Sequence, residues 1–250
     1  MKHLFLSDSQ LGAKELILAD ENFHYLKNVR RLKSGCKLTG VDSRGNIYNL
    51  QITGELPGKF ILEYRLKESG EKKVLEKIPY ITLYQGILKG NKFDAVIRQA
   101  TEAGIDRIVP LVSEYTIVKI KENSEYQKNE RWKRIAREAV QQSGRISIPE
   151  ITAPGILQKL KELEGLKLFF HQEPVSPKTL HSYLAECPGK IHVLIGPEGG
   201  FSQKEITWLD NNGFLPVYMG ANILRAETAA IFAIAAIKMI LLEKNEWRLI

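Results

Sequence analysis

The spacing of apolar residues changes once along this 250-residue chain, and that change constrains the fold more than any single motif. Up to about residue 75, apolar residues come in short runs separated by turns rich in glycine, proline, serine and asparagine; these runs are 3–6, 37–41, 47–52 and 60–64. Such spacing is typical of a small antiparallel barrel or sandwich. The charged segment 67–73 has almost no apolar side chain and is predicted to be a linker.

Beyond residue 79, short strands alternate with helical patterns. The pattern predicts strands at 80–84, 107–112, 168–170, 191–195 and 215–219, and helices at 91–103, 130–143, 202–213 and 228–242. This alternation favours a mostly parallel α/β sheet. The last helix is apolar nearly all round, so the sheet or a second subunit must bury it on several sides. We predict an α/β domain at 76–250 after a small β domain at 1–75, an α+β arrangement overall.

The composition is that of an ordinary globular protein with a surplus of basic residues. Hydrophobic residues make up 44% of the chain, which excludes the disordered and fibrous classes. The formal net charge of +7 favours a polyanionic partner. Basic residues cluster at 27–37 and 131–145. Either cluster alone could be a solvated face, but together they favour binding to an RNA or DNA backbone. A third turn adds Lys89. The candidate contacts are His24, Arg30, Arg31, Lys89, Arg131 and Arg145.

Cysteine and histidine spacing predicts neither a disulfide nor a metal site. Cys36 and Cys187 stand far apart without paired spacing, and the five histidines show no ligand spacing with cysteine or carboxylate residues. The first residues lack a signal-peptide pattern, and the apolar run 229–237 is too short to span a bilayer. We therefore expect a reduced, cytoplasmic setting and no membrane segment.

A glycine-rich loop follows the predicted strand 191–195 and leads into a helix that opens with a capping box at Ser202. Ligands of parallel sheets bind at the carboxyl ends of strands, and Gly196, Gly199 and Gly200 would let a ligand approach the backbone. A tight turn that simply needs glycine explains the motif equally well. The loop has neither the Walker A nor the GxGxxG pattern, which argues against a phosphate loop or a dinucleotide loop.

A second loop, at 219–227, repeats the order of strand, loop and buried helix, so the two loops would converge on one pocket. Glu227 could simply favour the positive end of the helix dipole. Arg225, set among apolar residues, is expected to anchor a partner or to pair with an acid such as Glu227. No GxSxG elbow supports hydrolase chemistry.

Five motifs, taken in order, resemble the RsmE family of bacterial ribosomal RNA methyltransferases, within the SPOUT superfamily. They are His24-Tyr25-Leu26 with Val29-Arg30; Lys89-Gly90 with Glu102-Ala103-Gly104; Arg131-Trp132 with Glu138-Ala139 and 142–145; 195–202; and 223–225 with 227–229. The resemblance covers nearly the whole chain. It implies a homodimer that methylates N3 of one uridine in 16S ribosomal RNA of the small subunit with S-adenosylmethionine. It also implies a PUA-like β-barrel at 1–75 and a SPOUT domain with a deep trefoil knot at 76–250.

The resemblance also assigns roles to residues. The cofactor would contact Phe170, His171, Ile195, Gly196, Pro197, Glu198, Gly199, Gly200, Met219, Gly220, Ile223 and Leu224. The chemistry of the transfer, rather than the resemblance, suggests two further roles: we expect Arg225 to stabilise the uridine anion, and Glu227 or Glu198 to take the N3 proton if burial raises its pKa.

The chain departs from the family pattern at two positions. Tyr115 stands where the family often carries arginine, and Ala226 stands where threonine is common. A methyltransferase acting on another ribosomal or transfer RNA position, and an RNA-binding module without activity, remain the alternatives. A nucleotide-dependent oxidoreductase is disfavoured by the missing GxGxxG pattern.

Overall fold

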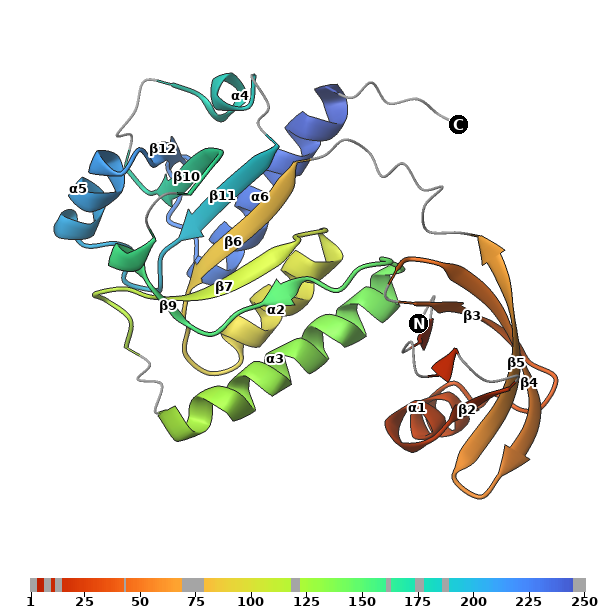
Figure 1. Ribbon diagram of the computed structural model, residues 1–250. Helices are drawn as coiled ribbons and strands as arrows, with labels where there is room; N and C mark the ends of the chain where they lie inside the picture. Colours follow the sequence, from red (N-terminus) through yellow and green to blue (C-terminus); the bar gives the residue numbers. More distant parts are fainter. Residues whose placement is uncertain are drawn as a thin grey trace. The chain divides into compact units, whose positions relative to one another are not determined.

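The computed structural model describes residues 4–6, 10–11, 15–42, 44–68, 79–117, 122–160, 163–173, 178–185 and 189–244 (Figure 1). The chain divides into two compact units. The first comprises Met1–Val74 with Val140–Ser147, and the second comprises Leu75–Ala139 with Ile148–Ile250. The predicted boundary near residue 76 and Cys187 lie outside the described residues, so the domain ranges 1–75 and 76–250 stay a prediction.

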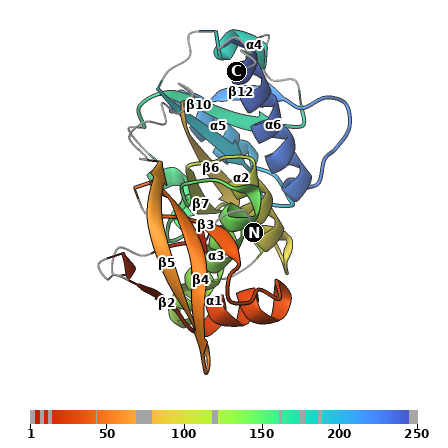
Figure 2. The ribbon, with the colours of Figure 1, turned by 90° about the vertical axis from the view of Figure 1, so that its right-hand side faces the viewer.

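The first unit contains a five-stranded sheet in the order β1-β3-β4-β5-β2. All neighbouring strands are antiparallel except β1 and β3, which are parallel. The long strands β4 and β5 run side by side in both views (Figures 1 and 2). The bounds are β1 (Leu4–Phe5), β2 (Leu16–Leu18), β3 (Lys37–Val41), β4 (Ile47–Leu56) and β5 (Lys59–Glu68). The mainly antiparallel character is confirmed, β2 was not predicted, and the first two residues of the predicted linker belong to β5.

The core of this unit follows from alternation along the strands. Leu50 and Ile52 on β4 and Phe60 and Leu62 on β5 point inward, while the residues between them face outward. A short α-helix, α1 (Asp20–His24), continues into a π-helix, η2 (Tyr25–Val29), and Leu26 of η2 is buried in the same core. The π-helix was not predicted.

The second unit contains a seven-stranded sheet in the order β12-β10-β11-β6-β7-β8, with β9 also paired to β7. Every pairing in it is parallel, which confirms the predicted parallel α/β sheet. The strands are β6 (Tyr80–Gly86), β7 (Arg107–Val112), β8 (Glu150–Ile151), β9 (Gly155–Ile156), β10 (Leu166–His171), β11 (Lys190–Ile195) and β12 (Leu215–Tyr218). The trefoil knot is a matter of chain threading and stays a prediction.

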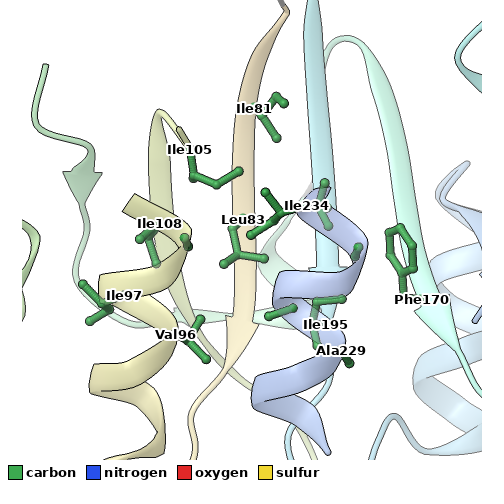
Figure 3. Close-up of a cluster of buried hydrophobic side chains, with 14 of the residues drawn as sticks. Ile81, Leu83, Val96, Ile97, Ile105, Ile108, Phe170, Ile195, Ala229 and Ile234 are labelled. Carbon is green, nitrogen blue, oxygen red and sulfur yellow. The ribbon is translucent and has the colours of Figure 1, made fainter. Parts of the chain in front are cut away.

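Helices cover both faces of this sheet. On one face, α2 and α6 lie side by side, and Val96 of α2 and Ile234 of α6 lie in one core with Leu83 of β6 (Figure 3). On the other face, Leu209 of α5 packs with Phe169 of β10. The helices that follow β6 among the described residues are α2 (Lys92–Glu102), α3 (Glu122–Ser143), η4 (Leu157–Lys159), α4 (Leu180–Tyr183), α5 (Gln203–Asn211) and α6 (Ala226–Lys244).

Two helix starts differ from the prediction by more than one residue. α3 begins eight residues earlier than expected, at Glu122, because its first turns are polar and carry no apolar periodicity. α6 begins at Ala226, which brings Glu227 into its first turn. Lys238, the charge within this apolar helix, donates a hydrogen bond to the carbonyl of Gly104 after the end of α2 (3.3 Å). A cation is stabilised there by the helix dipole of α2.

Candidate active site

The carboxyl ends of five adjacent parallel strands lie along one edge of the second sheet, in the order β12, β10, β11, β6 and β7. His171 ends β10, Ile195 ends β11, and Met219 directly follows β12. The sheet therefore brings together the three segments predicted to bind a cofactor. His171 is half-buried, and its Nδ1 accepts a hydrogen bond from the N–H of Glu173 (3.1 Å).

The loop after β11 packs against the carboxyl end of β6. A Cβ atom placed on Gly86 would lie 2.3 Å from the backbone nitrogen of Pro197, so only glycine fits there. The fully buried Gln85 donates from Nε2 to the carbonyls of Gly86 (3.1 Å) and Gly196 (3.4 Å). Its Oε1 has no hydrogen-bond partner among the described residues. The loop is thus fixed to the strand beside it through backbone contact.

Glu205 joins this loop to the end of β7. Its buried carboxylate accepts the N–H of Glu114 at Oε1 (2.8 Å) and the N–H of Ser202 at Oε2 (2.9 Å). Ser202 Oγ in turn donates to Glu114 Oε2 (2.6 Å) and accepts the N–H of Glu205 (3.3 Å). The capping box predicted at 202–205 is confirmed. We call Glu114, Ser202 and Glu205 together the Glu205 junction. The contacts that Glu114 makes in it could not be predicted from a local pattern.

Lys92 stands between two carboxylates that come from different loops. Its Nζ lies 3.6 Å from Glu198 Oε1 and 4.0 Å from Glu227 Oε2. Glu198 Oε1 also accepts the N–H of Lys89 (3.1 Å). Glu227 Oε2 is buried and has no hydrogen-bond donor within the described part of the chain. The sequence predicted a contact for Lys89 in this turn but not for Lys92, because both carboxylates near Lys92 come from loops more than 100 residues away in the chain.

Two expectations about charge need correction. Burial raises the pKa of the Glu198 carboxyl, but the N–H groups of Lys89 and of Glu198 itself and the charge of Lys92 outweigh it, so this pKa lies below its ordinary value. The condition set for Glu198 as a base, a raised pKa, is therefore not met. Arg225 does not pair with Glu227, whose cationic neighbour is Lys92; Arg225 is exposed and has no side-chain partner among the described residues.

The loop after β12 offers backbone groups and space. The N–H groups of residues 220–224 have no backbone partner in the described ranges. Gly220 has a φ of 100°, and no atom lies within 4 Å of where its Cβ would be. Met219 and Leu224 pack against the core, whereas Ile223 is 82% exposed. The loop is anchored at both ends and open in between.

The predicted RNA contacts do not all lie in one unit. His24, Arg30 and Arg31 are exposed at the end of α1 and around the end of η2, and Arg31 has a φ of 53°, a strained value for a non-glycine residue. Lys89 is exposed before α2. Arg131 forms an ion pair with Asp94 and donates to Asn91 Oδ1 (3.2 Å), so it ties α3 to α2. Arg145 donates to Ser147 Oγ (3.3 Å).

The described residues contain no group of three or more histidine, cysteine, aspartate or glutamate residues placed to hold a metal ion. None of the helices formed by these residues is both long and apolar enough to cross a membrane.

Comparison with known proteins identifies both halves of the chain. Residues 76–238 match the family model of an RNA methyltransferase domain, and residues 18–63 match that of an RNA methyltransferase PUA domain. Ribosomal RNA small subunit methyltransferase E of Synechocystis sp. is 33% identical over 95% of this chain and 77% of its own length. The Aquifex aeolicus protein of the same name is 34% identical over 92% of this chain and 96% of its own length.

Two solved structures with bound cofactor resemble this one. A Legionella pneumophila protein in complex with SAM has a TM-score of 0.85 and 29% identity, covering 95% of this chain and 97% of that one. Ribosomal RNA small subunit methyltransferase E from Neisseria gonorrhoeae bound to S-adenosyl methionine has a TM-score of 0.83 and 26% identity, covering 96% and 98%.

The Glu205 junction predicts a large loss of stability on substitution. Glu205→Ala removes the acceptor of two backbone N–H groups and should lower the free energy of unfolding by about 2–4 kcal/mol. Urea unfolding followed by tryptophan fluorescence measures this loss. Lys204→Ala, on the exposed side of the same helix turn, is the control and should change stability by less than about 0.5 kcal/mol. Equal effects of the two variants would contradict the prediction.

Proposed function

The chain belongs to the family of RNA methyltransferases that includes ribosomal RNA small subunit methyltransferase E, the RsmE family, and on that basis we propose that it methylates N3 of one uridine in 16S ribosomal RNA. The observation that carries the proposal is the 33% identity to a protein of that name over 95% of the chain, through both units. The substrate would be the small ribosomal subunit or its RNA, and the site of action the cytoplasm.

The loops after β10, β11 and β12 fit S-adenosylmethionine as the cofactor. The N–H groups of residues 220–224, which have no backbone partner among the described residues, can bind its polar atoms, and the open space at Gly200 and Gly220 leaves room beside the backbone. When bound, S-adenosylmethionine supplies a methyl group on a positively charged sulfur. We assign its contacts to Phe170, His171, Ile195, Gly196, Pro197, Glu198, Gly199, Gly200, Met219, Gly220, Ile223 and Leu224.

The chain's main task is to hold uracil N3 in line with the methyl carbon, at a near-attack distance of about 3–3.5 Å. N3 of uridine carries a proton at neutral pH, and its loss leaves negative charge on O2 and O4. Arg225 is exposed and without a side-chain partner among the described residues, so its guanidinium is free to donate hydrogen bonds to those oxygens. Arg225 cannot be the base, because guanidinium stays protonated.

Glu227 is the better candidate for the base. Its Oε2 is buried and accepts no hydrogen bond in the described ranges, and Lys92 Nζ lies 4.0 Å away, so it can accept the N3 proton without first losing a hydrogen bond. Glu198 instead accepts the N–H of Lys89 and faces Lys92, which makes it a residue that holds the loop. The basic residues His24, Arg30, Arg31, Lys89, Arg131 and Arg145 would contact the RNA backbone.

We further propose that α6 forms a homodimer interface. Phe232 and Met239 lie seven residues apart on one face of this helix and are 53% and 47% exposed. Exposed apolar side chains on a helix this hydrophobic indicate a surface that a second subunit covers.

The decisive experiment uses radiolabelled S-adenosylmethionine and small subunits from a strain that lacks the modification, followed by nucleoside analysis. Label in N3-methyluridine at a single position is expected. Label in another nucleoside would assign a different position, and cofactor binding without label would indicate a different RNA. Absence of cofactor binding would overturn the proposal in favour of an RNA-binding module.

Substitution of Arg225 tests its role in the reaction. Arg225→Ala should lower kcat by about 10²–10³-fold, the effect of removing one donor to a developing oxyanion. The Kd for S-adenosylmethionine, measured by calorimetry, should change far less. Arg98→Ala, an exposed arginine on α2, is the control and should leave both values unchanged. Equal losses in turnover and cofactor affinity would count against a transition-state role.

Charged substitutions on the exposed face of α6 test the dimer proposal. The wild-type chain should sediment at twice its mass of 28.4 kDa, whereas the double variant Phe232→Glu and Met239→Glu should sediment as a monomer. Ile156→Glu, which places the same charge on an exposed apolar residue of β9, should stay dimeric. A monomeric wild-type protein would refute the interface.

A further inference from the structure

Tyr115 is a large aromatic residue at the candidate active site that the mechanism above does not use. It lies in the turn after β7 and is 46% exposed. A Cβ atom on Gly199 would lie 2.9 Å from Tyr115 Cβ, 3.4 Å from its Cγ and 3.5 Å from its Cδ2. The Cβ and Cγ atoms of Tyr115 therefore pack against the backbone of the proposed cofactor loop. Position 199 has to be glycine because this side chain is there.

The turn that carries Tyr115 is held on both sides. Glu114, the residue before it, belongs to the Glu205 junction through its N–H and its carboxylate. After it, Thr116 donates its N–H to the carbonyl of Ser113 (3.0 Å), and its Oγ1 accepts the N–H of Ser113 (2.9 Å). The backbone of Tyr115 is therefore held in place, while its side chain is partly exposed to solvent. Its hydroxyl has no hydrogen-bond partner among the residues that the structure describes.

We propose that the Tyr115 ring stacks on the uracil that is methylated, an inference that rests on the proposed function. A base presented to a methyl donor must leave its stack, and proteins hold such bases by stacking on aromatic side chains. Stacking contacts the face of the base, so the N3, O2 and O4 edge stays free for Glu227 and Arg225. The ring is uncharged, so Tyr115 contributes contact with the base and no charge to the RNA backbone.

The test compares Tyr115→Leu and Tyr115→Phe with the wild-type chain in methyl transfer to small subunits. Loss of the ring in Tyr115→Leu should lower kcat/KM for the subunit about ten- to a hundredfold, which is the range for one lost base stack. Tyr115→Phe keeps the ring and should stay within about threefold, because stacking does not need the hydroxyl. The Kd for S-adenosylmethionine and the melting temperature should be unchanged in both.

Tyr80→Leu is the matched control. Tyr80 is 43% exposed and begins β6, so it lies at the opposite, amino-terminal end of the strands of the same sheet. A second readout is ultraviolet cross-linking to subunits whose RNA contains 5-bromouridine, with the attached peptide identified by mass spectrometry. A cross-link at Tyr115 that is absent at Tyr80 is expected.

Each other result overturns the inference in a distinguishable way. Wild-type rates for Tyr115→Leu would show that the ring does not hold the base. Equal loss of rate and of cofactor affinity would make Tyr115 a packing residue of the loop. Loss in Tyr115→Phe as large as in Tyr115→Leu would assign the effect to the hydroxyl. Failure of the wild-type chain to methylate any subunit RNA would instead overturn the proposed function, and the stacking role with it.

Discussion

The buried carboxylate of Glu205 determines how two loops of the second unit meet. A buried charge is tolerated only where hydrogen-bond donors surround it, and here the donors are backbone N–H groups from the end of β7 and from the start of α5. Neither loop can move without leaving a buried polar group unpaired. The contact of Tyr115 with Gly199 depends on this arrangement, because one residue follows Glu114 and the other precedes Ser202 in the chain.

The glycines of the candidate site serve two different purposes. At Gly86 and Gly199 a side chain would collide with Pro197 and Tyr115, so these glycines permit close packing of the protein with itself. At Gly200 and Gly220 the space is open and φ is positive, so these glycines leave room beside a free backbone. The sequence left two explanations open, a tight turn and a ligand loop, and each applies to different glycines. Only the three-dimensional surroundings of each glycine show which explanation holds.

Local signals predicted several elements whose determinants lie close together in sequence. The strand Arg107–Val112 and the capping box at Ser202 are both of this kind. The contacts of Glu198 with Lys89 and Lys92 depend instead on β11 pairing with β6, which no local pattern reveals. Of the two roles expected for Arg225, pairing with Glu227 is not found, because residues two apart at the start of a helix do not face each other; anchoring a partner stays a prediction.

The charges left unsatisfied by the fold are those that the proposed reaction needs. Most charged groups of this edge are paired within the chain, including Glu114 and Glu205 at the junction and Glu198 with Lys92. Two groups at the start of α6 are less satisfied among the described residues: Arg225 has no side-chain acceptor, and Glu227 Oε2 accepts no hydrogen bond, its cationic neighbour Lys92 lying 4.0 Å away. An arginine without an acceptor complements the oxygens of a uracil anion, and a carboxylate oxygen without a donor complements its departing proton. Folding alone gives no reason to leave both groups without a hydrogen bond, whereas a substrate that supplies an acceptor for one and a proton for the other does.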